Sequence, residues 1–225
     1  MAVLLWLPAC VAGEAPRHSV ASVGSIGSGP DGDSSSSGAG DGSDEAGDVG
    51  GSSSSSSSAG DGTTGEDGCA QYCALIDERC TDAQKQYPGG LECAAVCAGL
   101  AAGTPDDQLG NTVACRQFHA ISAAEDPVTH CLHAGPSGGG VCGGACENFC
   151  ALALASCVGP LSPWDGVEAC LADCAAFDTE PGFSATVVDG DSFACRMTHA
   201  TLAAVQPDPH CTHIGAVSPV CTDSP

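Results

Sequence analysis

Cysteines and apolar residues alternate with polar residues at helical spacing near the middle of the chain. The segment CAQYCALIDERC, residues 69–80, places its three cysteines on one face of a helix. The helix breakers Pro-Gly-Gly at 88–90 interrupt this pattern, and a second helix is expected from Leu91 to about Ala102. The pattern therefore predicts two antiparallel helices joined by a turn.

A third helix is expected further along the chain. Asn111 and Thr112 are both good N-cap residues, and Pro127 ends the helix. The segment that follows, from His130 to Cys142, is rich in glycine and proline. We therefore expect an ordered loop there, held in place at its cysteines.

The same pattern returns in the last third of the chain. Ser162 and Pro163 provide an N-cap and a first-turn proline for the second helix of this copy. Asp191 or Ser192 begins its third helix, and Pro207 ends it. Its last segment is expected to be a similar ordered loop.

Sixteen of the 17 cysteines form two sets, and five of the seven intervals recur without change. The first set is Cys69, Cys73, Cys80, Cys93, Cys97, Cys115, Cys131 and Cys142, and the second is Cys146, Cys150, Cys157, Cys170, Cys174, Cys195, Cys211 and Cys221. An even number of cysteines in so short a module is typical of domains stapled by disulfides. We predict a small all-α, disulfide-rich fold with two tandem helical modules, 69–142 and 146–221.

In each predicted hairpin, the C-x3-C pairs of the two helices can form two disulfide rungs. These are Cys69–Cys97, Cys73–Cys93, Cys146–Cys174 and Cys150–Cys170. The arrangement is similar to the twin C-x3-C hairpin of small mitochondrial Tim chaperones, but the shared spacing implies no chaperone role. The partners of Cys80, Cys115, Cys131 and Cys142 stay open, because eight cysteines allow many pairings.

Charge limits the partners of this chain. It has 5 Lys and Arg against 28 Asp and Glu, and a formal net charge of −23. Nucleic acids and anionic membrane surfaces are bound through basic side chains, so both are excluded as partners. Aromatic residues make up only 4% of the chain, which argues against one large conventional core.

The N-terminal segment 1–10, MAVLLWLPAC, resembles the lipobox of bacterial lipoproteins. On this interpretation it is a truncated signal peptide, and Cys10, the cysteine outside both sets, is lipidated. A chance apolar N-terminus is the alternative. Residues 11–68 consist mainly of Gly, Ser, Asp and Ala, so we expect a disordered, acidic tether.

Both modules contain the motif C-R-x-x-H-A followed by H-C-x-H, and six of the seven histidines fall at these positions. The motifs contribute Arg116, His119, His130 and His133 in the first module, and Arg196, His199, His210 and His213 in the second. One interpretation is that three imidazoles per module bind copper or zinc. Noncovalent haem held by a histidine is a variant of it. The other interpretation is structural, with these side chains hydrogen-bonded to carbonyls and carboxylates.

The sequence lacks several familiar catalytic motifs. H-E-x-x-H and a phosphate loop are absent, as is the C-x-x-C of thiol–disulfide exchange. We therefore expect a protein that is not an enzyme. In an oxidising compartment its cysteines form disulfides, whereas in a reducing cytosol zinc held by thiolates would be the better account.

The segment 110–144, GNTVACRQFHAISAAEDPVTHCLHAGPSGGGVCGG, resembles cysteine- and histidine-rich repeat modules of predicted surface lipoproteins from deltaproteobacteria of the myxobacterial type. Acidic Gly-Asp-Ser tethers are common in those proteins as well. The resemblance implies export and modularity, without an established activity. The second module departs from it at 214–219, where the glycine-rich loop is lost.

These observations lead to one expected function and one alternative. We expect an exported lipoprotein on the bacterial outer membrane or cell surface, or otherwise a periplasmic or secreted protein, which touches the membrane only through its lipid anchor. Its two modules are expected to bind a protein or glycan partner without catalysis. The alternative is metal or haem binding by the three histidines of each module.

Overall fold

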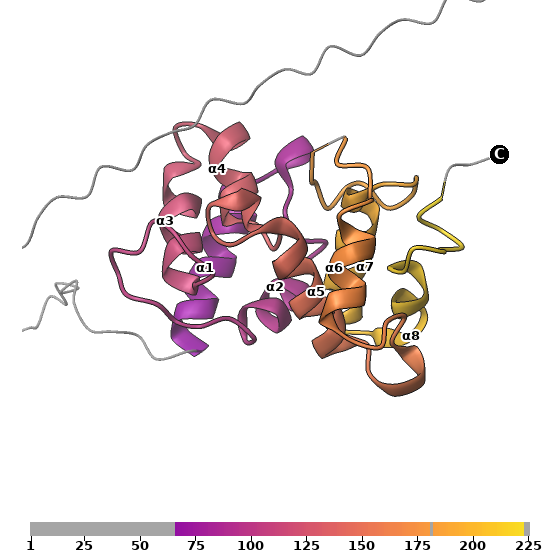
Figure 1. The fold of residues 1–225 in the computed structure, drawn as a ribbon. Coiled ribbons are helices and arrows are strands. Elements are labelled where there is room, and N and C mark those ends of the chain that lie inside the picture. The colour runs from indigo at the N-terminus through magenta and orange to yellow at the C-terminus, as the bar shows by residue number, and fades with distance from the viewer. Residues whose placement is uncertain (1–65, 181, 223–225) are drawn as a thin grey trace, which may run out of the picture. The chain divides into compact units, whose positions relative to one another are not determined.

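The computed structural model describes residues 66–180 and 182–222, which form helices joined by turns and loops (Figure 1). The predicted all-α, disulfide-rich fold is confirmed, since the described residues form no β-strand, only an isolated bridge between Ala101 and Thr112. Within these ranges, no helix has the length and apolar character needed to cross a bilayer. The predicted signal segment with Cys10, and nearly all of the predicted tether, lie outside the described residues.

The first module contains four α-helices and two short 3-10 helices. They are α1 (Glu66–Arg79), η1 (Asp82–Gln84), α2 (Gly90–Cys97), α3 (Val113–Ser122), α4 (Pro127–Ala134) and η2 (Gly138–Gly140). Helix α1 packs against α2, α3 and α4, and α3 packs against α4. The buried Tyr72 hydroxyl donates to the carbonyl of Ala134 (2.6 Å) and lies 2.9 Å from the Tyr87 hydroxyl, so polar bonds as well as apolar contacts tie α1 to α4.

The second module repeats this order with different side chains in its core. Its helices are α5 (Ala145–Ser156), η3 (Gly159–Leu161), α6 (Val167–Cys174), α7 (Phe193–Ala203), α8 (Pro207–His210) and η4 (Cys211–His213). Phe149 of α5 is fully buried, and the rings of Trp164, Phe177 and Phe193 meet it edge to face. Aromatic packing therefore replaces the paired tyrosines of the first module.

Eight disulfides join the sixteen module cysteines, and each closes within one module. The pairs are Cys69–Cys97, Cys73–Cys93, Cys80–Cys131, Cys115–Cys142, Cys146–Cys174, Cys150–Cys170, Cys157–Cys211 and Cys195–Cys221. The four predicted rungs are confirmed. The other four pairs connect different parts of each module. Cys80–Cys131 and Cys157–Cys211 attach the ends of α1 and α5 to the segments that bear two histidines. Cys115–Cys142 and Cys195–Cys221 attach α3 and α7 to the end of each module.

The segment after the third helix contains a further helix, so the expectation of an ordered loop from His130 was wrong. The side chain of Asp126 accepts a hydrogen bond from the backbone N–H of Thr129 (3.2 Å), and Pro127 occupies the first turn of α4. An Asp cap followed by proline favours the start of a helix. In the second module only the short α8 and η4 form there.

Two other helix boundaries also differ from expectation. Helix α6 begins at Val167 after Gly166, because the Ser162 hydroxyl donates to the carbonyl of Trp164 (2.7 Å) in a turn rather than capping a helix. Helix α2 ends at Cys97 and does not continue to Ala102. Neither difference moves a cysteine away from its disulfide partner.

The two modules touch one another. The backbone N–H of Ala185 donates to the carbonyl of Lys85 (2.7 Å), and Leu152 of α5 packs against buried residues of both modules. The disulfides therefore define each module separately, while noncovalent contacts connect them.

Candidate metal centre

The three histidines of the first module come from two adjacent helices. His119 lies on α3, and His130 and His133 lie on α4, which packs against α3. The side chain of Thr112 caps α3 by accepting from the backbone N–H of Cys115 (3.1 Å). Positions i and i+3 of a helix share one face, so His130 and His133 both point toward His119.

The imidazole rings of this cluster are in close contact. Nδ1 of His119 lies 2.9 Å from Nδ1 of His130, and the two rings are stacked with centroids 5.1 Å apart. The His133 ring meets His119 edge-on, at 4.9 Å between centroids. One nitrogen of each ring lies within 4.8 Å of the others, so the structure brings the three predicted residues together.

The second module has a matching cluster, although its fourth helix is much shorter. Nδ1 of His199 on α7 lies 3.0 Å from Nδ1 of His210 and 3.3 Å from Nδ1 of His213. The three ligand atoms again lie within 4.8 Å of one another. In this module all three Nδ1 atoms converge on the same region.

Backbone carbonyls hold the central histidine of each cluster. Nε2 of His119 lies 3.2 Å from the carbonyl oxygen of Gln108, and Nε2 of His199 lies 3.1 Å from that of Val188. A carbonyl oxygen only accepts, so in both rings Nε2 carries the hydrogen and Nδ1 keeps its lone pair. Metal-binding histidines commonly use their second nitrogen in this way, which fixes the tautomer and orients the ring.

His133 has a buried nitrogen without a partner among the described residues. Its Nδ1 makes no hydrogen bond there, and a Cβ added to Gly139 of η2 would lie 2.8 Å from the Cδ2 atom of its ring. Leaving a buried polar atom unpaired costs about 1–3 kcal/mol. A ligand for this nitrogen would remove that cost.

Burial favours the neutral form of four of these imidazoles. It lowers the pKa of His119 and His199, and the hydrogen bonds to the backbone carbonyls oppose the shift only in part. Burial also lowers the pKa of His133 and His210, and neighbouring histidines lower it further. Neutral imidazole is the form that binds a metal.

The nitrogen separations fit a single metal ion. Two nitrogens that each lie about 2.0–2.1 Å from zinc, at a tetrahedral angle, are about 3.3 Å apart. The Nδ1 separations from His199 are 3.0 and 3.3 Å, and the one from His119 to His130 is 2.9 Å. These three separations are close to the tetrahedral value, so each of these pairs can share one ion.

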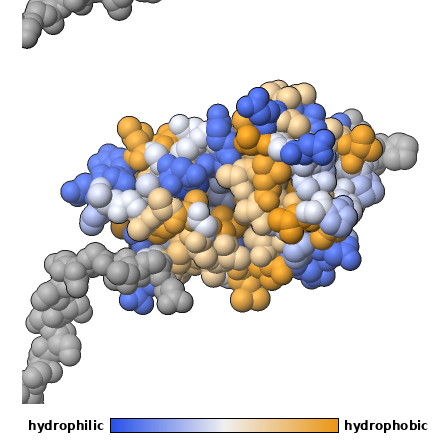
Figure 2. All heavy atoms as spheres, turned by 60° about the horizontal axis from the view of Figure 1, so that its bottom comes forward, coloured by the Kyte–Doolittle hydropathy of each residue, from blue (hydrophilic) through white to orange (hydrophobic). Residues whose placement is uncertain are grey.

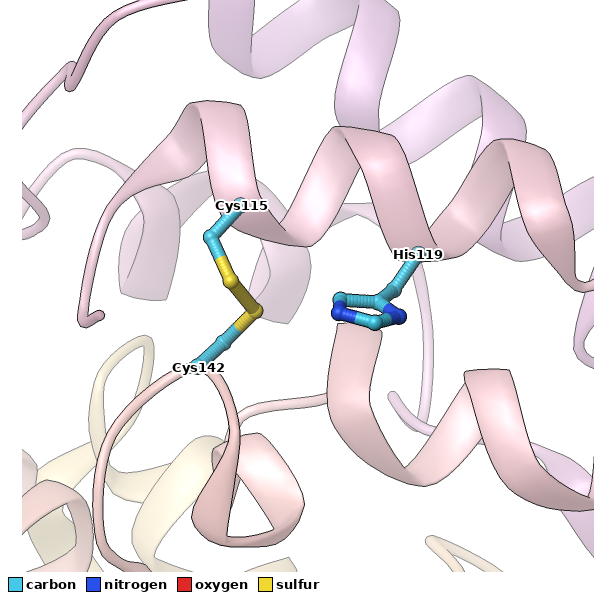
Figure 3. A group of neighbouring side chains, drawn as sticks. All are labelled: Cys115, His119 and Cys142. Carbon is cyan, nitrogen blue, oxygen red and sulfur yellow. A yellow bond between two sulfur atoms is a disulfide. The ribbon is translucent and has the colours of Figure 1, made fainter. Parts of the chain in front are cut away.

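A disulfide lies beside the central histidine of each cluster. Figure 3 shows the His119 ring next to the Cys115–Cys142 bond, which joins α3 to the end of the module. Cys195, Cys221 and His199 form the same group in the second module. Because these sulfurs are bonded to one another, they are not thiolates, and the nitrogen atoms are the ligands that each site offers.

The arginine of each motif has a structural role. Arg116 is fully buried, and it donates to the carbonyl of Gly135 (3.3 Å) and to the side chain of Asn111 (2.8 Å). Arg196 donates to the carbonyl of Gly215 (3.2 Å) and pairs with the Asp191 carboxylate (2.6 Å). Both arginines therefore hold the segment after the histidines against the third helix.

A model of the BfoA family C-terminal domain matches the chain twice, over residues 52–145 and 144–222. The chain belongs to the BfoA family. Each match contains one set of eight cysteines and one histidine cluster. No solved structure matches the chain.

Curated relatives of this BfoA-family chain come from fungi. Aurasperone B biosynthesis cluster protein A of Aspergillus niger is 38% identical over 71 residues, which are 31% of this chain and 23% of that protein. Bifonsecin B biosynthesis cluster protein A of Aspergillus brasiliensis is 38% identical over 71 residues, 31% of this chain and 24% of that protein. The chain thus matches about a quarter of the length of these relatives.

The family match corrects the resemblance drawn from the segment 110–144. That segment does not belong to modules of deltaproteobacterial surface lipoproteins, because it lies within the BfoA match and the relatives are Aspergillus proteins. The lipobox interpretation of Cys10 depends on bacterial lipidation, and Cys10 lies outside the described residues. Lipidation of Cys10 stays a prediction that the BfoA match does not support.

Parts of the site had no signal in the sequence. The carbonyl groups of Gln108 and Val188 are backbone atoms, so their side chains do not mark them. Gly139, which lies against His133, was recognisable only as one of a run of glycines. The six histidines, by contrast, were found by their recurrence at matched positions.

Proposed function

We propose that each module binds one transition-metal ion, copper or zinc, through its three imidazoles. The observation that carries this proposal is the repeated convergence of three histidine nitrogens within 4.8 Å, in two modules whose cores differ. Imidazole nitrogen is a good ligand for both metals. The proposed function is binding without catalytic turnover.

A purely structural role accounts for only part of the cluster. The hydrogen bond from His119 Nε2 to the backbone fits either role, as does a proton shared between His119 and His130. Nδ1 of His133 is buried and makes no hydrogen bond to a described residue, which a purely structural role leaves unexplained. A metal ion gives all three nitrogens a partner at once, which favours metal binding.

Haem fits the cluster less well than a single ion. Haem iron takes its protein ligands on its axis, whereas these three nitrogens converge on one small region. The site is therefore better matched to an ion with several imidazole ligands.

The compartment follows from the cysteines. Eight disulfides in one chain are typical of an oxidising environment, so we propose that the protein acts outside the reducing cytosol as a secreted or surface protein. With its sulfurs oxidised, each module can offer nitrogen but not thiolate ligands.

Metal analysis of the full chain tests the proposal. Protein made in an oxidising compartment, with its sixteen module cysteines oxidised, is dialysed with copper or zinc and analysed for bound metal. We expect two ions per chain, and one ion in either double variant, His130→Gln with His133→Gln or His210→Gln with His213→Gln.

The matched control is the seventh histidine of the chain. His18→Gln lies outside both motifs and should retain two ions. Correctly oxidised protein that retains no metal, or variants that bind as much as the unaltered chain, would contradict the proposal.

Binding of a protein or glycan partner is the second candidate. Figure 2 shows hydrophobic residues among polar ones on the face that it draws. Leu91, Leu109 and Val128 are each about 70% exposed, so these three apolar side chains are available to a partner. Replacement of all three by serine should leave metal binding unchanged while it weakens capture of such a partner.

A further inference from the structure

We propose that the metal ion in the first module keeps one coordination position open for a small exchangeable anion. This inference rests on the proposed metal site, and it concerns what that site can bind once it holds an ion. It distinguishes a centre that takes up a ligand from a closed structural site, in which the protein fills all positions.

The first step is the number of ligands. Two groups of possible ligands contain His119 among the described residues. One is the three histidines, and the other adds the sulfurs of Cys115 and Cys142 to His119. Those sulfurs are joined in a disulfide, which makes them weak donors. Copper and zinc commonly take four or more ligands, so three imidazoles leave a position unfilled.

The second step is the position of an acid that acts on the cluster. Asp126 lies close enough to act on His130 and His133, but its carboxylate is held as the cap of α4 by the backbone N–H of Thr129 (3.2 Å). Moving it onto the metal would break that cap. Glu92 of α2, in the first module, acts on His210 of the second, and no side-chain cap bond holds its carboxylate at the start of α2. The first site is therefore the better candidate for an open position.

The third step is access and size. His119 is 6% exposed, whereas His130 and His133 are partly exposed, so the cluster borders the solvent. The backbone of Gly139 lies against the ring edge of His133 and limits the space on that side. A small ligand such as hydroxide or azide suits this position.

The fourth step is charge. Three neutral imidazoles leave both positive charges on a divalent ion, because the site contributes no carboxylate or thiolate. An anion is then a stronger fourth ligand than a neutral molecule, and a water bound there has a lowered pKa.

Azide binding to the copper-loaded protein tests the inference. The full chain with His210→Gln and His213→Gln, which retains only the first site, is loaded with Cu²⁺ and titrated with azide. We expect a new charge-transfer absorption band that saturates at one azide per copper, a changed electron paramagnetic resonance spectrum, and copper that stays with the protein on ultrafiltration.

Three results would overturn it. If azide leaves the spectrum unchanged while copper is fully bound, the protein fills the fourth position. If azide changes the spectrum only in Asp126→Asn, the carboxylate of Asp126 is the group that fills it. Asn is also a good N-cap, so this variant keeps α4. Copper released in proportion to azide shows competition instead of ligand addition. A chain that binds no copper removes the proposed function itself, which is a distinct outcome.

Discussion

The two modules surround the same disulfide pattern with different cores. The first buries Tyr72 and Tyr87, joined through their hydroxyl groups, whereas the second packs Trp164 and other aromatic rings around Phe149. The four disulfides nevertheless pair in the same order in both modules, and the central histidine bonds to a carbonyl at nearly the same distance. The cross-links and the histidines are thus common to two otherwise different interiors, which is expected if the scaffold exists to hold the cluster.

The buried arginines differ as well. Arg116 faces the neutral side chain of Asn111, and Arg196 faces the carboxylate of Asp191 and stacks over the ring of Phe177, 4.2 Å from its centroid. Both arginines still reach the backbone at the corresponding place, Gly135 or Gly215. The two arginines therefore share the hydrogen bond to the backbone carbonyl of a glycine. Only Arg196 also has a carboxylate that balances its charge.

Removing the longest-range disulfide should have the largest effect and should affect both modules alike. Cys80–Cys131 and Cys157–Cys211 span 51 and 54 residues, and a loop of that length is worth about 4 kcal/mol in the unfolded state. Replacing either pair by alanine should lower the free energy of unfolding by that amount, measured by guanidinium denaturation. A module that loses less than about 1 kcal/mol would break the equivalence.

Exchanging the arginine partners should have opposite effects in the two modules. Asp191→Asn leaves the buried Arg196 with a neutral partner and should cost about 1–2 kcal/mol, because the carboxylate itself is half exposed and partly screened. Asn111→Asp should stabilise the first module by less than that. Urea denaturation of each variant measures the change, and equal effects of the same sign would contradict the comparison.

The glycine-rich turn should matter only in the first module. Gly139 has φ of +53°, and its added Cβ would meet the His133 ring, so Gly139→Ala should cost about 1 kcal/mol and weaken metal binding there. Gly140 is the matched control, since it also has positive φ (+79°) but no atom within 4 Å of an added Cβ. Calorimetric titration should show weaker metal binding for Gly139→Ala than for Gly140→Ala. Equal loss in both would assign the effect to the backbone alone.

Mild acid should destabilise the metal-free protein slightly. The pKa values of His119 and His199 are lowered in the folded state, so below the ordinary value of about 6.5 the unfolded chain binds protons that the folded chain does not. Stability should therefore be fully present above pH 6.5 and fall as the pH drops through the lowered values. Denaturation midpoints between pH 7.5 and about 5 measure the slope. His119→Gln with His199→Gln should reduce it, and His133 and His210, whose pKa values are also lowered, should account for part of what remains.

The sequence contained enough information for the hairpins but not for the remaining cross-links. The C-x3-C pairs at Cys69 and Cys93 predicted rungs because helix periodicity alone puts both cysteines of a pair on one face. Pairing of Cys80 with Cys131 depends on how α4 packs against α1, which is a tertiary contact. Local patterns do not determine such contacts.

The helix α4 was missed although its signal was present. The glycine and proline content of the segment around Cys142 dominated the expectation, whereas Asp126 and Pro127 marked a helix start. For the candidate site, recurrence identified all six histidines. Their convergence in the first module depends on the angle at which α3 meets α4. The hydrogen bond of His119 to the carbonyl of Gln108 depends on the path of the 101–112 segment. The spacing of the histidines in the sequence determines neither of these.

The order of the cysteines has a consequence for synthesis. Each of the eight bonds closes within its own half, and Cys142, the last cysteine of the first half, precedes Cys146, the first of the second. No native pair joins the two sets, so all partners of the first four bonds are synthesised before Cys146. The cysteines of the earlier half therefore need no residue of the later half to reach their native pairing.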